Sequence, residues 1–110
     1  MKGTYLGEFE EVVLLAVGIL QEDAYGVTIR LEIESQTKRI VNIGAVHTAL
    51  HRLEEKGFLK SKFGEVTEAR GGKRKRVFTL TPFGLKALRE AQSLRSQMWA
   101  QLPKMILQHK

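Results

Sequence analysis

The sequence contains no cysteine, which excludes disulfide bonds and removes the thiolate ligands of zinc and iron–sulfur sites. It has only 2 prolines, and its longest apolar run, residues 12–20, is far shorter than a membrane-spanning helix of about 20 residues. The acidic first residues do not resemble a secretion signal. A length of 110 residues suits one compact domain. We therefore expect a single-domain cytoplasmic protein that does not contact a membrane.

Positive charge is concentrated in the second part of the chain. The formal net charge is +6, but residues 1–37 hold two basic and seven acidic side chains. Residues 38–76 hold eleven basic and four acidic side chains, and residues 77–110 hold five basic and one acidic. This distribution favours an anionic partner bound on one face, although many soluble proteins are basic for no such reason.

The first two segments of the chain differ in how clearly their pattern predicts structure. Residues 8–20 carry apolar residues on more than one stripe, including Leu15 and Ile19, which predicts a buried helix with two packing partners. Residues 25–35 alternate apolar and polar side chains as a β-strand does. Tyr25, Ile29 and Ile33 also have helical spacing, so the residues themselves leave this segment open between strand and helix.

The boundaries of the later elements are marked by capping residues. Asn42 is a suitable N-cap for a helix that runs to Lys56, and Gly57 follows where a left-handed C-terminal cap belongs. Two short strands are expected over 59–65 and 73–80, joined by a polar turn with two glycines. Thr81 and Pro82 predict the start of a last helix that runs to about residue 102, before Pro103.

The order of these elements predicts the fold class. If residues 25–35 are helical, three helices precede a hairpin and a long helix, which is the winged helix-turn-helix arrangement, an α+β fold that is mainly α. Residues 1–80 would form the DNA-binding region, and residues 81–110 a C-terminal dimerisation helix.

The third predicted helix has an outward face suited to a DNA major groove. Gly44 and Ala45 would let its first turn approach the DNA backbone, where free N–H groups bind phosphate. Candidate DNA contacts on or before this helix are Asn42, His47, Thr48, His51 and Arg52, preceded by the cations Lys38 and Arg39. An ordinary solvated helix face is an equally good interpretation of this feature alone.

The predicted hairpin carries the strongest indication of an anionic partner. Five of the seven residues from 70 to 76 are basic. The candidate phosphate-binding residues are Arg70, Gly72, Lys73, Arg74, Lys75 and Arg76. An edge strand protected from aggregation by charge is the alternative, but one or two lysines would serve that purpose, whereas four consecutive cations repel one another.

The last predicted helix has an apolar stripe that a small winged domain does not need for its own core. The stripe contains Leu88, Ala91, Leu94, Met98 and Leu102. We expect it to pair with a second copy of the chain, although folding back onto its own core is the alternative. Trp99 lies near the stripe and is a candidate for stacking on a small aromatic effector, or simply an interface anchor.

No enzyme motif accompanies these features. His47 and His51 are four residues apart on a helix, but Thr48 stands where the zinc-protease motif has glutamate, and no third ligand is evident. The serines lack a nucleophile-elbow pattern, and the residues 71–73 lack the spacing of a phosphate-binding loop. We expect no enzymatic activity, no cofactor and no metal.

Several motifs together resemble the PadR family of bacterial transcriptional regulators. They are LGEFEE at 6–11, AYGV at 24–27, IGAV at 43–46, RLEEKG at 52–57, GGKRK at 71–75 and LTPFG at 80–84. The resemblance implies a homodimeric winged-helix repressor of the short, single-domain type, with a helix from Tyr25 to about residue 36. It also implies an operator in double-stranded DNA near genes for stress response, detoxification or efflux. Some members bind small aromatic ligands near the dimer interface.

One residue departs from the pattern of that family. Members usually have tyrosine where this chain has His47, and histidine has a shorter reach and can titrate, so the family's contact there is not carried over unchanged. Two other functions stay open: a winged-helix module that binds an acidic protein, and a sensor of a ligand or metal centred on Trp99 or the two histidines.

Overall fold

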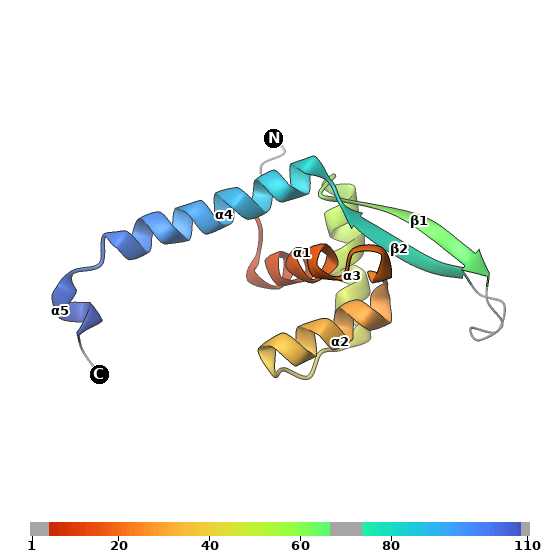
Figure 1. Ribbon diagram of the computed structural model, residues 1–110, viewed down its shortest axis with the longest axis horizontal. Coiled ribbons are helices and arrows are strands. Elements are labelled where there is room, and N and C mark those ends of the chain that lie inside the picture. Colours follow the sequence, from red (N-terminus) through yellow and green to blue (C-terminus); the bar gives the residue numbers. More distant parts are fainter. Residues whose placement is uncertain (1–4, 67–73, 109–110) are drawn as a thin grey trace.

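The computed structural model describes residues 5–66 and 74–108, which form a helical body with a β-hairpin extending from one side and a long C-terminal helix from the other (Figure 1). The helices are α1 (Glu8–Leu20), α2 (Gly26–Thr37), α3 (Ile43–Glu55), α4 (Pro82–Ala100) and the short α5 (Lys104–Leu107), with a 3-10 turn, η1 (Gln21–Asp23). The strands are β1 (Leu59–Val66) and β2 (Arg74–Leu80), which pair in antiparallel. This is the predicted winged helix-turn-helix.

The segment that sequence patterns left open is a helix. The backbone N–H of Tyr25 donates to the Thr28 hydroxyl over 3.0 Å at the start of α2. Ile29 and Ile33, four residues apart, are buried, whereas Leu31, which a strand would place on the same face, is 51% exposed. Packing of one helical stripe therefore decides the structure against the local β-propensity.

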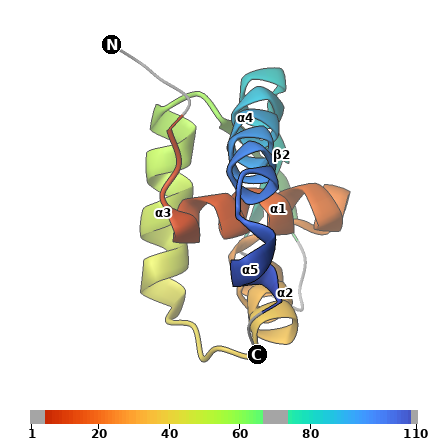
Figure 2. The same cartoon turned by 90° about the vertical axis from the view of Figure 1, so that its left-hand side faces the viewer.

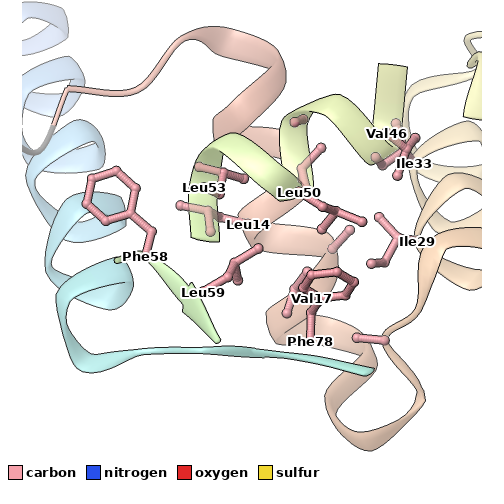
Figure 3. Packing of buried hydrophobic residues seen from close by; sticks show 14 of the residues in the cluster. Leu14, Val17, Ile29, Ile33, Val46, Leu50, Leu53, Phe58, Leu59 and Phe78 are labelled. Carbon is pink, nitrogen blue, oxygen red and sulfur yellow. The ribbon is translucent and has the colours of Figure 1, made fainter. Parts of the chain in front are cut away.

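α1 lies at the centre of the molecule and supplies the middle of the core (Figure 3). It packs against α2, α3, α4 and β2, so the expected second packing partner is present. Its buried side chains are joined by apolar residues from every other large element: Ile29, Ile33, Val46, Leu50, Leu53, Phe58, Leu59, Phe78 and Ala87. Leu15 and Ile19, which the sequence predicted to be buried, are exposed, because they line an open groove between α1 and α2.

Capping residues fix the ends of α3 as predicted. The Asn42 side-chain oxygen accepts hydrogen bonds from the N–H groups of Gly44 (2.6 Å) and Ala45 (3.4 Å). Gly57, just after the helix, has a φ of +84°, a conformation that only glycine adopts without strain. The chain can therefore reverse within two residues and enter β1.

The hairpin is tied to the helices along the side that carries Phe78. Leu59 pairs with Leu80, Ser61 with Phe78 and Phe63 with Arg76, after which the register shifts before Val66. The Phe78 N–H donates to the carbonyl oxygen of Ala24 over 2.8 Å, so β2 also bonds to the turn between α1 and α2. The predicted turn with Arg70, Gly72 and Lys73 lies outside the described residues.

α4 leaves the body of the protein and extends away from it (Figures 1 and 2). The Thr81 hydroxyl accepts from the Gly84 N–H over 3.0 Å and donates to the Gly57 carbonyl over 2.7 Å, which anchors the predicted helix start. The helix ends at Ala100, two residues earlier than predicted, because Pro103 cannot continue it. No helix within 5–66 and 74–108 combines the length and apolarity that crossing a bilayer requires.

Candidate nucleic-acid interface

α3 has one buried face and one exposed face. Val46, Ala49, Leu50 and Leu53 pack into the core. The residues predicted to contact DNA lie on the other side of the helix and are exposed: Gly44, Ala45, His47, Thr48, His51 and Arg52. A helix packed on one side and lined outward by hydrogen-bonding side chains can enter a major groove about 12 Å wide.

The first turn of α3 is less available to phosphate than the sequence suggested. The N–H groups of Gly44 and Ala45 are already bound by the Asn42 side chain. Asn42 therefore acts as the cap of the helix. Gly44, which has no side chain, and the small side chain of Ala45 still allow close approach of a DNA backbone to this end of α3.

The hairpin and α3 border a common groove of about 400 Å³. His47, His51 and Glu54 line it from α3, and Arg74 and Arg76 line it from β2. The start of α2 closes one end, where a Cβ at Gly26 would lie 2.8 Å from a ring carbon of His47. The exposed face of α3 and the basic arm of the wing therefore lie on the same side of the molecule, as a DNA-binding surface requires.

The three described wing cations have different surroundings. Arg74 is exposed. The Lys75 ammonium lies 4.5 Å from the ring centroid of Tyr25, within range of a cation–π interaction. The Arg76 guanidinium points toward α3, where it bonds to Glu54 Oε1 (2.8 Å) and to the Ser61 hydroxyl (2.9 Å). Arg74 and Lys75 therefore fit the predicted role in phosphate binding better than Arg76 does.

The cations before α3 also differ. Lys38 ends α2 in a left-handed conformation (φ 61°) and is exposed. The Arg39 guanidinium bonds to Glu8 at 2.5 and 3.3 Å, and this hydrogen-bonded pair lowers the pKa of Glu8 and raises the pKa of Arg39. Glu8 therefore offsets part of the positive charge that Arg39 would present to DNA.

The apolar stripe of the last helix is divided between two environments. Leu88 packs partly against the core of its own chain, and Ala91 is half-buried. Arg95 forms an ion pair with Glu11 of α1, and every described residue after it is exposed. The exposed part includes Leu94, Met98, Trp99 and Leu102. The second half of the helix therefore does not fold back onto its own core.

Sequence reasoning missed the partners of the wing. Glu54 and Ser61 bind Arg76 from 22 and 15 residues away, and no local pattern predicts such a contact before the hairpin register is known. No sequence pattern indicated either that Ile40, between α2 and α3, is 100% exposed. Within the described residues no group of three His, Cys, Asp or Glu side chains is placed to hold a metal, and His51 lies 3.6 Å from Glu55.

Solved structures with the same fold come from several bacteria. A PadR-like transcriptional regulator from Bacillus cereus has a TM-score of 0.70 and 18% identity, with 93% of each chain covered. A PadR family transcriptional regulator from Eggerthella lenta has a TM-score of 0.68 and 22% identity, with 93% of this chain and 88% of that chain covered. A transcriptional regulator from Clostridium thermocellum has a TM-score of 0.64 and 25% identity, with 82% and 87% covered. Comparison with curated proteins gives no significant match.

A match to a family model extends from the core of α1 into α4. The family is described as the transcriptional regulator PadR-like family, and residues 14–90 match, which is more than half of the chain. Its members are DNA-binding transcriptional regulators and not enzymes, which confirms the prediction that this chain is not an enzyme. By this match and by its winged-helix fold, the chain belongs to the PadR-like family of transcriptional regulators.

Proposed function

We propose that this chain binds a specific duplex DNA site as a homodimer and represses nearby genes. The observation that carries the proposal is the groove shared by α3 and β2, because it puts hydrogen-bonding side chains beside exposed cations on one surface. Base contacts supply specificity and phosphate contacts supply position and most of the affinity. We expect its targets to be genes for stress response, detoxification or efflux. We expect the protein to act in the cytoplasm.

The candidate residues divide into two roles. Thr48, His47 and Arg52 lie on the outward face of α3 and are assigned to base edges in the major groove. Lys38, Arg74 and Lys75 lie at the ends of neighbouring elements and are assigned to phosphates. The predicted contacts of Arg70, Gly72 and Lys73 fall outside the described residues and stay predictions.

The dimer rests on apolar surface that one chain leaves uncovered. Met98 and Trp99 are 61% and 63% exposed on α4, with Leu94 and Leu102 beside them. A second apolar surface includes Leu15 and Ile19, which line a groove of about 270 Å³ between α1 and α2. Exposed apolar patches of this kind mark interfaces, and two copies joined by α4 would present two recognition helices to a two-fold DNA site.

The DNA-binding role is tested by fluorescence anisotropy with a duplex selected by the protein from a random library. The selected site should consist of two symmetric halves about 10 base pairs apart. Arg74→Ala should weaken binding to selected and random duplexes alike and flatten the dependence of log K on log salt by about one unit for each lost phosphate contact. Thr48→Ala should weaken binding mainly to the selected site.

A matched control removes the same charge elsewhere. Lys104→Ala, on exposed α5, should leave both the affinity and the salt dependence unchanged. Equal effects of Arg74→Ala and Lys104→Ala would contradict the proposed surface. If the wild-type chain bound no duplex at all, a module for an acidic protein partner would replace this proposal.

The dimer is tested by sedimentation equilibrium. Met98→Asp should raise the dimer dissociation constant at least about tenfold, because an unpaired carboxylate would be buried in an apolar interface. Ser96→Asp introduces the same charge two residues away, on the opposite side of α4, and should change the constant little. A wild-type chain that stays monomeric at high micromolar concentration would contradict the dimer.

A small aromatic effector is a second proposal that the exposure of Trp99 supports. An indole ring near a dimer interface can stack on a flat ligand. Titration with planar aromatic compounds should then quench the fluorescence of Trp99, the one tryptophan in the chain, and weaken DNA binding over the same concentration range. Quenching without any change in DNA affinity would contradict a regulatory role for the ligand.

A further inference from the structure

Three polar side chains connect the recognition helix to both strands of the wing. Glu54, in the last turn of α3, accepts from the Ser61 hydroxyl of β1 (2.6 Å) and from Arg76 Nη2 of β2 (2.8 Å). Arg76 Nε also donates to the Ser61 hydroxyl over 2.9 Å. Each of the three residues bonds to the other two. We call this closed cluster of Glu54, Ser61 and Arg76 the wing brace.

Two aromatic rings lie near the guanidinium of the wing brace. The central carbon of the Arg76 guanidinium lies 5.7 Å from the ring centroid of Phe63 and 5.7 Å from that of Phe78, within range of cation–π interactions. Phe78 is part of the core, whereas Phe63 is 60% exposed. Arginine thus combines both ring contacts with hydrogen bonds from two of its nitrogens, and lysine lacks the planar fork that makes those bonds.

The wing brace lies where it can control the direction of the distal hairpin. Arg76 pairs with Phe63 at the last regular position of the sheet, and the register shifts between Phe63 and Val66. Arg74, the exposed phosphate candidate, follows directly beyond this point. Rotation of the hairpin about its base would therefore move Arg74 relative to α3 unless the brace prevents it.

We propose that Arg76 is a positioning residue, which with Glu54 and Ser61 fixes the wing at one distance from the recognition helix and does not itself bind phosphate. The inference rests on the proposed DNA-binding function and assigns a role within that surface. A wing fixed before DNA arrives loses less conformational freedom on binding, which raises affinity without adding a contact.

The brace and a phosphate contact predict opposite effects of removing Glu54. If Arg76 bound phosphate, loss of the neighbouring carboxylate would free the guanidinium and remove a negative charge from the DNA-binding surface, so DNA would bind more tightly. If the brace positions the wing, Glu54→Ala should weaken binding about threefold to tenfold, the range expected for one partly exposed charged network.

Two further substitutions sharpen the test. Arg76→Lys keeps the positive charge but loses the planar fork, so the brace predicts binding as weak as in Arg76→Ala, with an unchanged salt dependence. Glu54→Gln keeps one oxygen that can accept from Arg76, and its amide NH2 can donate to the Ser61 hydroxyl, so this variant should bind DNA more tightly than Glu54→Ala despite having the same charge. The double variant Glu54→Ala with Arg76→Ala should be no weaker than either single variant.

Glu55→Ala is the matched control, because it removes the same charge from the next residue of α3. Glu55 lies on the exposed surface and pairs with His51 at 3.6 Å, outside the brace. Its removal should leave DNA binding unchanged or slightly tighter. Tighter binding by Glu54→Ala, or full binding by Arg76→Lys, would overturn the inference.

Amide hydrogen exchange of the free protein separates this inference from the proposed function. Glu54→Ala and Arg76→Lys should speed exchange at Lys62 and Val77, the neighbouring pair whose N–H groups face the other strand, by about threefold to tenfold, and Glu55→Ala should not. Unchanged exchange would overturn the brace whether or not DNA binds. Failure of the wild-type chain to bind duplex DNA would instead overturn the proposed function, and with it the DNA role of the brace.

Discussion

Gly84 is the position where an added methyl group should damage the fold most directly. It lies in the first turn of α4, and a Cβ built on it would be 2.2 Å from the carbonyl oxygen of Phe58 and 2.8 Å from Leu80 Cδ1. The obstacle is main chain of the segment between α3 and β1, which cannot rotate away as a side chain could. The backbones must separate by about 0.8 Å before the first contact reaches even 3.0 Å.

The cost of Gly84→Ala follows from this geometry. Overpacking of a close-packed site costs about 1–3 kcal/mol, and a main-chain obstacle puts this site at the upper end. Alanine returns up to about 1 kcal/mol through its higher helix propensity. We expect a net loss of about 2 kcal/mol in the free energy of unfolding, or a fall in Tm of roughly 8–16 °C.

Gly18→Ala is the matched control for this substitution. Gly18 lies in α1 and also faces Leu80, but its Cβ would meet Leu80 Cδ2 at 3.8 Å, an ordinary contact. The propensity gain should remain and stabilise the protein by about 0.5–1 kcal/mol. Thermal and urea unfolding measure both variants. A Gly84→Ala variant as stable as the wild type would mean that the backbones at this contact can separate without cost.

Three further predictions concern the ends of helices near the proposed interface. Asn42→Ala should lower the free energy of unfolding by about 1 kcal/mol in urea titrations, because α3 loses its N-cap; no change would mean that water replaces the cap without cost. Lys38→Gly should raise Tm, because glycine adopts the left-handed conformation of this position without strain, and it should weaken DNA binding, because the charge is lost. A lower Tm would mean that lysine is not strained in this conformation. The pKa of Glu8 is lowered by its bond to Arg39, so the pair stabilises the fold above the unfolded pKa of glutamate and this contribution disappears as pH falls through the lower folded pKa. The stability difference between the wild type and Glu8→Gln should therefore be small at pH 7, given the exposure of the pair, and vanish once the pH has fallen below the lowered folded pKa of Glu8; a difference that grows in acid would have the wrong sign.

Local signals in the sequence were enough to place most elements. Asn42, Gly57 and the Thr81–Pro82 pair act on their own backbone within a few residues, so the ends of α3 and the start of α4 were predictable without tertiary information. The wing followed from two short apolar segments around glycines. The same local character explains why the predicted recognition face of α3 is exposed as expected.

The remaining features depend on contacts between distant residues. The pattern of residues 25–35 leaves strand and helix open, and the family resemblance implied the helix that the burial of Ile29 and Ile33 against the core stabilises. Arg39 and Arg76 look free in the sequence, yet they pair with Glu8 and Glu54 after the chain has folded. Composition can therefore count the cations of a basic segment, but only the fold shows which of them are available to DNA.

The proposed function requires that one surface, formed by α3 and the wing, meets duplex DNA. Titration of the ¹⁵N-labelled protein with a duplex of about 20 base pairs follows every backbone amide at once. We expect the largest chemical-shift changes within residues 44–52 and 74–76. Changes concentrated on α5 or on the exposed side of α1, with α3 unaffected, would mean that DNA binds elsewhere.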